Sequence, residues 1–132
     1  MELVIKNAEK SVTIMTTAQG LMRKVEGLKP VFEKLKKKGV KIKIAAPLGK
    51  VNSKTAKDFK AFAELKHIDK SRSRFIVVDG KELVFALLDD AEVHPTYDTG
   101  IWVKTPFFVN AVQEMFNSLW EVMKPADSVV KQ

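Results

Sequence analysis

Hydrophobic residues along this chain fall into short blocks whose spacing alternates between strand-like and helix-like. Strand-like blocks occupy Val12–Met15, Val40–Ala46, Phe75–Val78 and Leu83–Leu88, and in the second of these the apolar residues alternate with lysines. Helical spacing covers the segment from Pro30 to Gly39. The block Phe75–Val78 is unbroken and rich in β-branched residues, which predicts a strand covered on both faces.

A hairpin is predicted around this buried strand. Asp79 and Gly80 supply the residues that a tight turn prefers, and Leu83–Leu88 returns as a second strand. Arg72 and Arg74 stand just before the first strand, two residues apart, so both side chains point to the same side. They form a candidate site for an anion or a polar ligand. The alternative, that they are solvated charges flanking a strand, remains open.

The other segments complete an alternating order of strands and helices. The pattern predicts a helix end within Glu2–Glu9, a short helix over Ala18–Val25, a helix over Lys54–Leu65 capped by Ser53, a short strand at Lys66–Lys70, a polar candidate lid over Asp89–Tyr97, a strand at Asp98–Val103, and a final helix over Phe107–Met123 opened by Thr105–Pro106 and ended by Pro125. This order implies an α/β fold with a mixed β-sheet and helices on both faces.

Polar residues flank several of the predicted strand ends. In an open α/β sheet such ends gather along one edge, where ligands bind. The candidate ligand-binding residues are Arg72, Arg74, Thr16, Thr17, Asp98 and Thr99. Two arginines there favour a carboxylate, a phosphate or a polyol phosphate. The two threonines could instead cap the helix that follows them, and both interpretations stay open.

The final helix carries more apolar surface than one core-facing helix needs. One stripe contains Val109, Val112, Phe116, Leu119 and Trp120, and a second contains Phe108, Ala111, Met115 and Val122. A second stripe predicts burial by another layer or another subunit. We therefore expect a homodimer, with a monomer whose own helices cover both stripes as the alternative.

Composition limits the classes of function. With 132 residues the chain is expected to form one domain, with a flexible tail over residues 125–132. It has no cysteine, so it forms no disulfide or thiolate metal site, and no His/Asp/Glu group has metal-ligand spacing, so neither a metal nor a cofactor is expected. No apolar run is long enough to span a membrane and no signal peptide is recognisable, which favours a cytoplasmic protein.

The formal net charge of +7 raises nucleic-acid binding as a hypothesis. The excess lies largely on predicted helix faces, at Lys34, Lys36, Lys37, Lys38, Lys54, Lys57 and Lys60, without interleaved exposed aromatic residues. Solvated helix faces explain such a distribution as well as a basic nucleic-acid-binding module does.

The hairpin resembles the signature of the phospholipase D superfamily, His-x-Lys-x4-Asp followed by glycine. Arg74 falls on the lysine, Asp79 on the aspartate and Gly80 on the glycine, while Arg72 occupies the position of the histidine. That resemblance implies a half-barrel fold and an imidazole nucleophile, which a protonated guanidinium cannot replace. We therefore expect no catalysis. The alternative is a phosphodiesterase or nuclease with a rearranged site that uses His67 or His94.

Three further motifs resemble the effector domain of TrmB-like archaeal transcriptional regulators. They are Arg74–Gly80, Asp98–Trp102, and the segment from Thr105–Pro106 to Leu119–Trp120, and the resemblance covers residues 1–124. It implies a non-catalytic regulatory domain that dimerises and senses a small polar or anionic effector. DNA would be read by an N-terminal winged helix, which is absent from this chain. In sugar-responsive relatives much of the sugar site lies in a further C-terminal domain.

Overall fold

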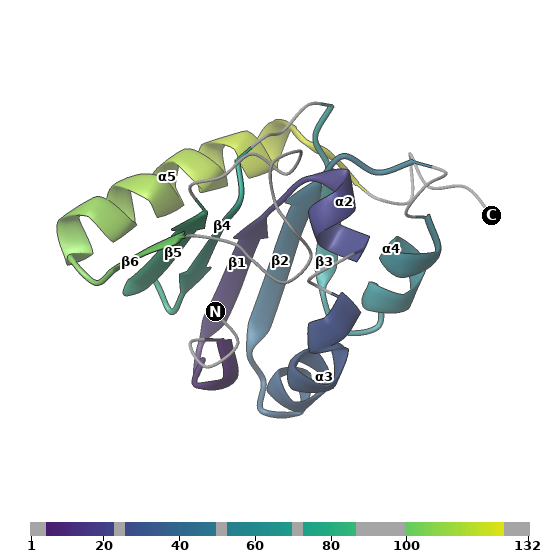
Figure 1. Cartoon of the computed structure of the whole chain (residues 1–132), viewed down its shortest axis with the longest axis horizontal. Helices are drawn as coiled ribbons and strands as arrows, with labels where there is room; N and C mark the ends of the chain where they lie inside the picture. Colours follow the sequence, from purple (N-terminus) through teal and green to yellow (C-terminus); the bar gives the residue numbers. More distant parts are fainter. Residues whose placement is uncertain (1–4, 23–25, 50–52, 70–72, 87–99, 126–132) are drawn as a thin grey trace.

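The computed structural model describes residues 5–22, 26–49, 53–69, 73–86 and 100–125 (Figure 1). The described strands are β1 (Ser11–Met15), β2 (Lys41–Ala46), β3 (Glu64–His67), β4 (Phe75–Val78), β5 (Glu82–Ala86), β6 (Gly100–Val103) and β7 (Lys124–Pro125). The described helices are α2 (Ala18–Gly20), the 3-10 turn η2 (Glu26–Leu28), α3 (Lys29–Lys37), α4 (Ser53–Phe59) and α5 (Pro106–Val122).

All the described strands join one mixed sheet in the order β6-β5-β4-β1-β2-β3-β7. Strands β1, β2 and β3 run parallel, and β4 lies antiparallel beside β1. The meander β4-β5-β6 then extends the sheet on one side, and β7 closes the other side against β3. The sequence-based prediction of a mixed sheet with the hairpin strand near its centre is confirmed.

Helices cover both faces of the sheet, as predicted. Figure 1 shows α2, α3 and α4 together on one face and α5 crossing the other. In β4 the side chains of Ile76 and Val78 join the core beneath α3 and α4, whereas Phe75 and Val77 join the core beneath α5. The prediction that this strand is covered on both faces is therefore confirmed.

Aromatic residues anchor each core. Under α3 and α4 the ring of Phe32 meets that of Phe59 edge-on, with 5.6 Å between centroids. Under α5 the rings of Phe116 and Trp120 stack at 5.5 Å, and Phe75 packs edge-on against Phe116. Each buried ring of this size stabilises the fold by about 1.5–3 kcal/mol, so the two faces hold comparable apolar anchors.

Several turns and caps follow directly from single residues. Asp79 and Gly80 both have positive φ, 56° and 65°, as a tight primed hairpin turn requires. Gly39 has φ 87° just after α3, the predicted stop. Thr105 precedes α5, and its hydroxyl accepts the Phe108 N–H at 3.4 Å, so the predicted cap is confirmed. The predicted cap at Ser53 lies outside the described side chains.

Two predicted boundaries are wrong. The helix expected over Lys54–Leu65 ends at Phe59, and the following strand begins at Glu64 rather than at Lys66. Pairing explains both shifts, because Glu64–His67 hydrogen-bonds in register with β2 and tertiary pairing overrides local helical spacing. Pro125, assigned to the tail from the sequence, pairs with Lys66 as part of β7.

Helix α5 buries only one of its apolar stripes within the described residues. Val109, Phe116 and Trp120 are buried against the sheet. In the second stripe Met115 is 66% exposed and Val122 is 80% exposed. Leu119, predicted to face the core, is instead 44% exposed, because it points about 100° around the helix from the buried Trp120.

Candidate functional site

The strand ends predicted to form a site meet along one edge of the sheet. Because β1, β2 and β3 run parallel, their carboxyl ends share this edge. The antiparallel partners bring the start of β4, the end of β5 and the start of β6 to the same edge. The topology therefore brings together the strand ends that Thr16, Thr17 and Arg74 flank.

Thr16 and Arg74 lie opposite each other at this edge. Met15 pairs with Phe75 in the antiparallel register of β1 and β4, so the next position along each chain faces the other. The backbone of Arg74 continues the pairing with β5, because its carbonyl accepts the Ala86 N–H at 2.8 Å. Both Thr16 and Arg74 are only 6% exposed. A guanidinium held this deeply is a fixed part of the sheet edge rather than a solvated flanking charge.

Thr17 acts as a helix cap. Its hydroxyl accepts the Gly20 N–H at 2.9 Å and opens α2, which resolves one of the two alternatives left open for this residue. Gly20 in turn lies directly against the Thr16 hydroxyl, so that a methyl group added at Gly20 would collide with Thr16 Oγ1. The site edge and the first turn of α2 are therefore packed as one unit.

This contact predicts a specific pattern of stability in variants. Gly20→Ala is expected to cost about 1–3 kcal/mol, because overpacking a filled position forces its neighbours to move. In a Thr16→Ala background the same substitution should be nearly neutral, since the colliding hydroxyl is gone. Urea unfolding of the four proteins in this double-mutant cycle measures the coupling. Thr16→Ser, which keeps the hydroxyl, serves as the control, and equal costs in all backgrounds would contradict the contact.

Three of the predicted site residues, Arg72, Asp98 and Thr99, lie outside the described residues, as does the candidate lid over residues 89–97. Gly100, which follows Thr99 in the chain, begins β6 at the site edge and pairs with Ala86. The assignment of Arg72, Asp98 and Thr99 to the site remains a prediction from sequence.

Asp79, the aspartate of the signature, lies at the opposite end of β4 from Arg74. Its carboxylate accepts the backbone N–H groups of Glu9, Lys10 and Ser11 at 2.7–3.2 Å. Partial burial alone would raise the pKa of Asp79, but these backbone donors and the charge of Lys81 outweigh it and hold the pKa below its ordinary value. These hydrogen bonds fasten the start of β1 to the hairpin turn.

His67 ends β3, and both of its ring nitrogens have partners. Its Nδ1 accepts the Leu48 N–H at 2.9 Å, which leaves the proton on Nε2, 2.9 Å from an Asp69 carboxylate oxygen. A nitrogen that accepts a backbone hydrogen bond has no lone pair left for attack on phosphorus. His94, the other histidine of the enzymatic alternative, lies outside the described residues.

Two further kinds of site can be judged within the described ranges, a metal site and a membrane-spanning helix. No cluster of three His, Asp or Glu side chains within them could hold a metal ion. No helix in the same ranges combines the length and apolar character needed to cross a bilayer.

One group of polar residues was missed from the sequence. Lys41 and Lys43 alternate with buried residues on β2 and project from the face that α5 crosses. The sequence shows this alternation, but it does not show which helix lies over the lysine side of the strand. Lysines on a strand inside a sheet indicate that helices do not fully cover that face.

A family model described as transcriptional regulator TrmB, EBD N-terminal subdomain, matches residues 1–124. The chain belongs to this TrmB family. The resemblance drawn from the three sequence motifs is confirmed, and the matched span equals the predicted one. No curated protein matches the sequence.

Solved structures agree with this assignment. TrmBL2, an archaeal chromatin protein reported with a novel mode of DNA binding, is 25% identical with a TM-score of 0.71. The match covers 93% of this chain and 48% of TrmBL2, so the TrmB-family chain spans about half the length of that protein.

Two phospholipase D-like structures share the fold at lower identity. Nuc, a phospholipase D family member from Salmonella typhimurium, is 14% identical with a TM-score of 0.73, and the match covers 94% of this chain and 86% of Nuc. NucT from Helicobacter pylori is 10% identical with a TM-score of 0.74, covering 94% and 87% of the two chains. The predicted phospholipase D-like architecture is confirmed.

Proposed function

We propose that this chain is the non-catalytic effector-sensing and dimerisation domain of a TrmB-like transcriptional regulator. Family membership over residues 1–124 supports the regulatory class. The single observation that carries the ligand site is the register of β1 and β4, which ends at Met15 and Phe75 and so brings Thr16 and Arg74 to an edge shared by seven strand ends. The absence of catalysis is supported by Arg72 at the nucleophile position and by the engaged Nδ1 of His67.

The effector is proposed to be a small polar or anionic molecule. A buried guanidinium presents N–H donors in a rigid fork that matches a carboxylate or a phosphate. Thr16 offers a hydroxyl beside it, and Arg72, Asp98 and Thr99 are proposed to complete the site from the flanking segments. A donor-rich edge with one acid suits a phosphate, a dicarboxylate or a polyol phosphate.

The ligand proposal is tested by thermal unfolding in the presence of inorganic phosphate, a dicarboxylate and glycerol phosphate. A ligand present at 100 times its dissociation constant should stabilise the fold by about 2.7 kcal/mol. Arg74→Lys keeps the positive charge but removes the planar guanidinium. We therefore expect this variant to need at least about ten times more ligand for the same stabilisation.

Two controls separate this result from general effects. Lys81→Gln removes an exposed charge at the hairpin, at the far end of the sheet, and should leave the ligand response unchanged. Thermal unfolding of Arg74→Lys without ligand measures how far the substitution itself lowers the stability of the fold. If all three ligands fail to stabilise the wild-type chain, or if Lys81→Gln weakens the response as much as Arg74→Lys, the site is contradicted.

The dimerisation proposal is supported by an exposed apolar surface on α5 and β6. Phe107 is 88% exposed, and the other large exposed apolar side chains on the α5 side are Ile101, Phe108, Met115, Leu119 and Val122. Soluble monomers rarely leave a patch of this kind in water. A second copy of the chain, related by a two-fold axis, is the proposed partner for this surface, which we name the α5–β6 surface.

A further inference from the structure

The sheet face beneath α5 becomes polar toward the amino ends of β1 and β2. The helix buries Met15 on β1 and Ala45 on β2, near the carboxyl ends of these strands. Toward the opposite ends, the same face carries the buried Thr13, the half-buried Lys43 and the exposed Lys41. The strand registers set Thr13 beside Lys43 and Ser11 beside Lys41, so these polar residues lie together as a patch that opens to solvent at Lys41.

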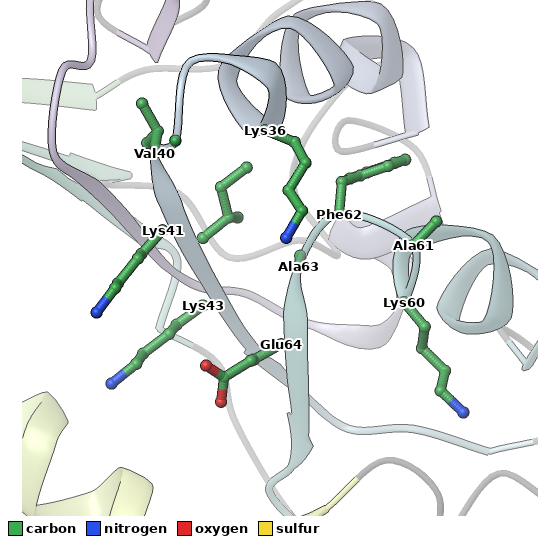
Figure 2. Close-up of a pocket in the computed structure, with 11 residues that line it drawn as sticks. Lys36, Val40, Lys41, Lys43, Lys60, Ala61, Phe62, Ala63 and Glu64 are labelled. Carbon is green, nitrogen blue, oxygen red and sulfur yellow. The ribbon is translucent and has the colours of Figure 1, made fainter.

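Two hollows meet at this patch. The larger has a volume of about 570 Å³ and extends from β2 to the ends of α3 and α4. Figure 2 shows Lys41, Lys43 and Glu64 projecting to one side of the strands, with Lys36 reaching from α3 toward Ala63. The smaller has a volume of about 280 Å³ and extends toward Lys10 and the hairpin turn. Lys41 and Lys43 line both hollows, which therefore adjoin along β2.

We call the surface formed by Lys10, Lys36, Lys41 and Lys43 the basic trough. Its acidic neighbours are Glu64, which stands beside Lys43 in the register of β2 and β3, and Asp79. The four lysine charges outnumber these two carboxylate charges, and the Asp79 carboxylate is directed at the backbone N–H groups of Glu9 to Ser11. The trough is therefore net positive.

Trp120 helps to position the lysines of this face. The Lys43 ammonium lies 5.5 Å from the centre of the Trp120 ring, and that of Lys66 lies 4.7 Å from it. Lys66 also donates to the Trp120 carbonyl at 2.9 Å. Contacts of this type hold a lysine stem in place while its charge stays near solvent, so part of the cationic surface is ordered before any ligand arrives.

The shape and chemistry of the trough favour an extended polyanion over an enclosed small molecule. It is open to solvent, its walls are the polar side chains Ser11, Thr13, Gln113 and Asn117, and its cations are lysines. Lysines bind phosphate as point charges without demanding one geometry. Such a surface suits a backbone of repeated phosphates that is read without regard to base sequence.

We propose that the basic trough binds the phosphate backbone of double-stranded DNA. The chain belongs to a family of transcriptional regulators, which act on DNA, so a duplex is the polyanion this surface meets. This contact is separate from the proposed effector site, which lies at the other end of the same strands. The domain would then add sequence-independent affinity for DNA to the affinity of a DNA-binding domain that contacts the bases.

The test measures binding of the chain to a short, fluorescently labelled duplex by anisotropy over a series of salt concentrations. Lys41→Gln/Lys43→Gln is expected to weaken binding about tenfold or more at low salt. It should also flatten the slope of log affinity against log salt by about 1.8, because each lost phosphate contact contributes about 0.9. A second double variant, Lys36→Gln/Lys41→Gln, guards against a folding defect and should behave alike.

The matched control is Lys34→Gln/Lys37→Gln, which removes the same net charge from exposed positions of α3 that do not line the trough. We expect it to keep most of the affinity and the slope. Equal losses for the trough pair and the control pair would mean that only the diffuse positive charge binds DNA, and would overturn the proposal. Equally tight binding of tripolyphosphate, displacing the duplex, would overturn the assignment to DNA.

Discussion

Met115→Glu is expected to convert the chain from a dimer into a monomer at micromolar concentration. Met115 lies in the middle of the exposed stripe of α5, flanked by Phe108 and Val122. A carboxylate buried there without a partner should cost about 2–4 kcal/mol of association free energy, as for a central interface residue. That corresponds to a dissociation constant roughly 30- to 700-fold larger. Two-fold symmetry introduces the charge from both copies.

The same substitution should leave each protomer folded. Met115 is already 66% exposed in the single chain, so the core under α5 does not depend on it. Sedimentation equilibrium measures the association, and circular dichroism reports the fold. Lys34→Glu, an equally strong change on exposed α3, should leave the dimer intact. A wild-type chain that sediments as a monomer, with the α5–β6 surface open, would rule out self-association as the role of that surface.

Asp79→Ala is expected to destabilise the fold by about 2–4 kcal/mol, the largest effect of any single polar residue described. The substitution removes the carboxylate oxygens that accept three backbone N–H groups. Because the carboxylate is only partly buried, solvent screening reduces the stabilisation that each of these bonds provides. It also puts alanine at φ 56°, a conformation that aspartate tolerates better. Asp79→Gly also loses the carboxylate but tolerates the positive φ, so the difference between the two variants isolates the backbone strain. The stability that Asp79→Gly still loses relative to the wild type reports the acceptors. Urea unfolding provides each value.

The contribution of the Asp79 charge should depend on pH in a defined direction. Folding lowers the pKa of Asp79 below its ordinary value of 3.8, so the ionised form is favoured in the native state. Its stabilisation is present above that value and disappears as pH falls through the lower, native pKa. The stability gap between wild type and Asp79→Asn should therefore narrow below about pH 4. Asp58→Asn, on exposed α4, should show no such narrowing, and a gap independent of pH would contradict a role for the charge.

Features set by local chemistry were predictable from the sequence. The turn at Asp79–Gly80, the cap at Thr105 and the stop at Gly39 each depend on one or two residues and their neighbours. The burial of Phe75–Val78 on both faces was equally visible, because a strand with no polar residue has no side left for water. The excess apolar surface of α5 could also be predicted, because its apolar residues form two stripes at helical spacing.

Features set by strand order were harder to predict. That Arg74 faces Thr16 depends on β4 lying beside β1, and a sequence alone does not specify which strands become neighbours. The same holds for the hydrogen bonds of Asp79, whose partners lie 68–70 residues earlier in the chain. The exposure of Lys41 on this sheet face was not predicted, because it depends on where α5 crosses, which the periodicity of the helix does not determine.

The pairing of β1 with β4 also has a consequence for the chain as it is synthesised. Strand β1 pairs with β2, which in turn pairs with β3, but the second edge of β1 has no partner until β4 has been made. An unpaired edge on an apolar strand is a template for pairing with other chains. After His67, the end of β3, eleven more residues complete β4 at Val78. At a synthesis rate of ~5–20 residues per second, the second edge of β1 therefore stays unpaired for roughly 0.5–2 s after β3 is made. The hairpin that carries Arg74 therefore also protects the nascent domain from aggregation, and a chain interrupted before Val78 would lack that protection.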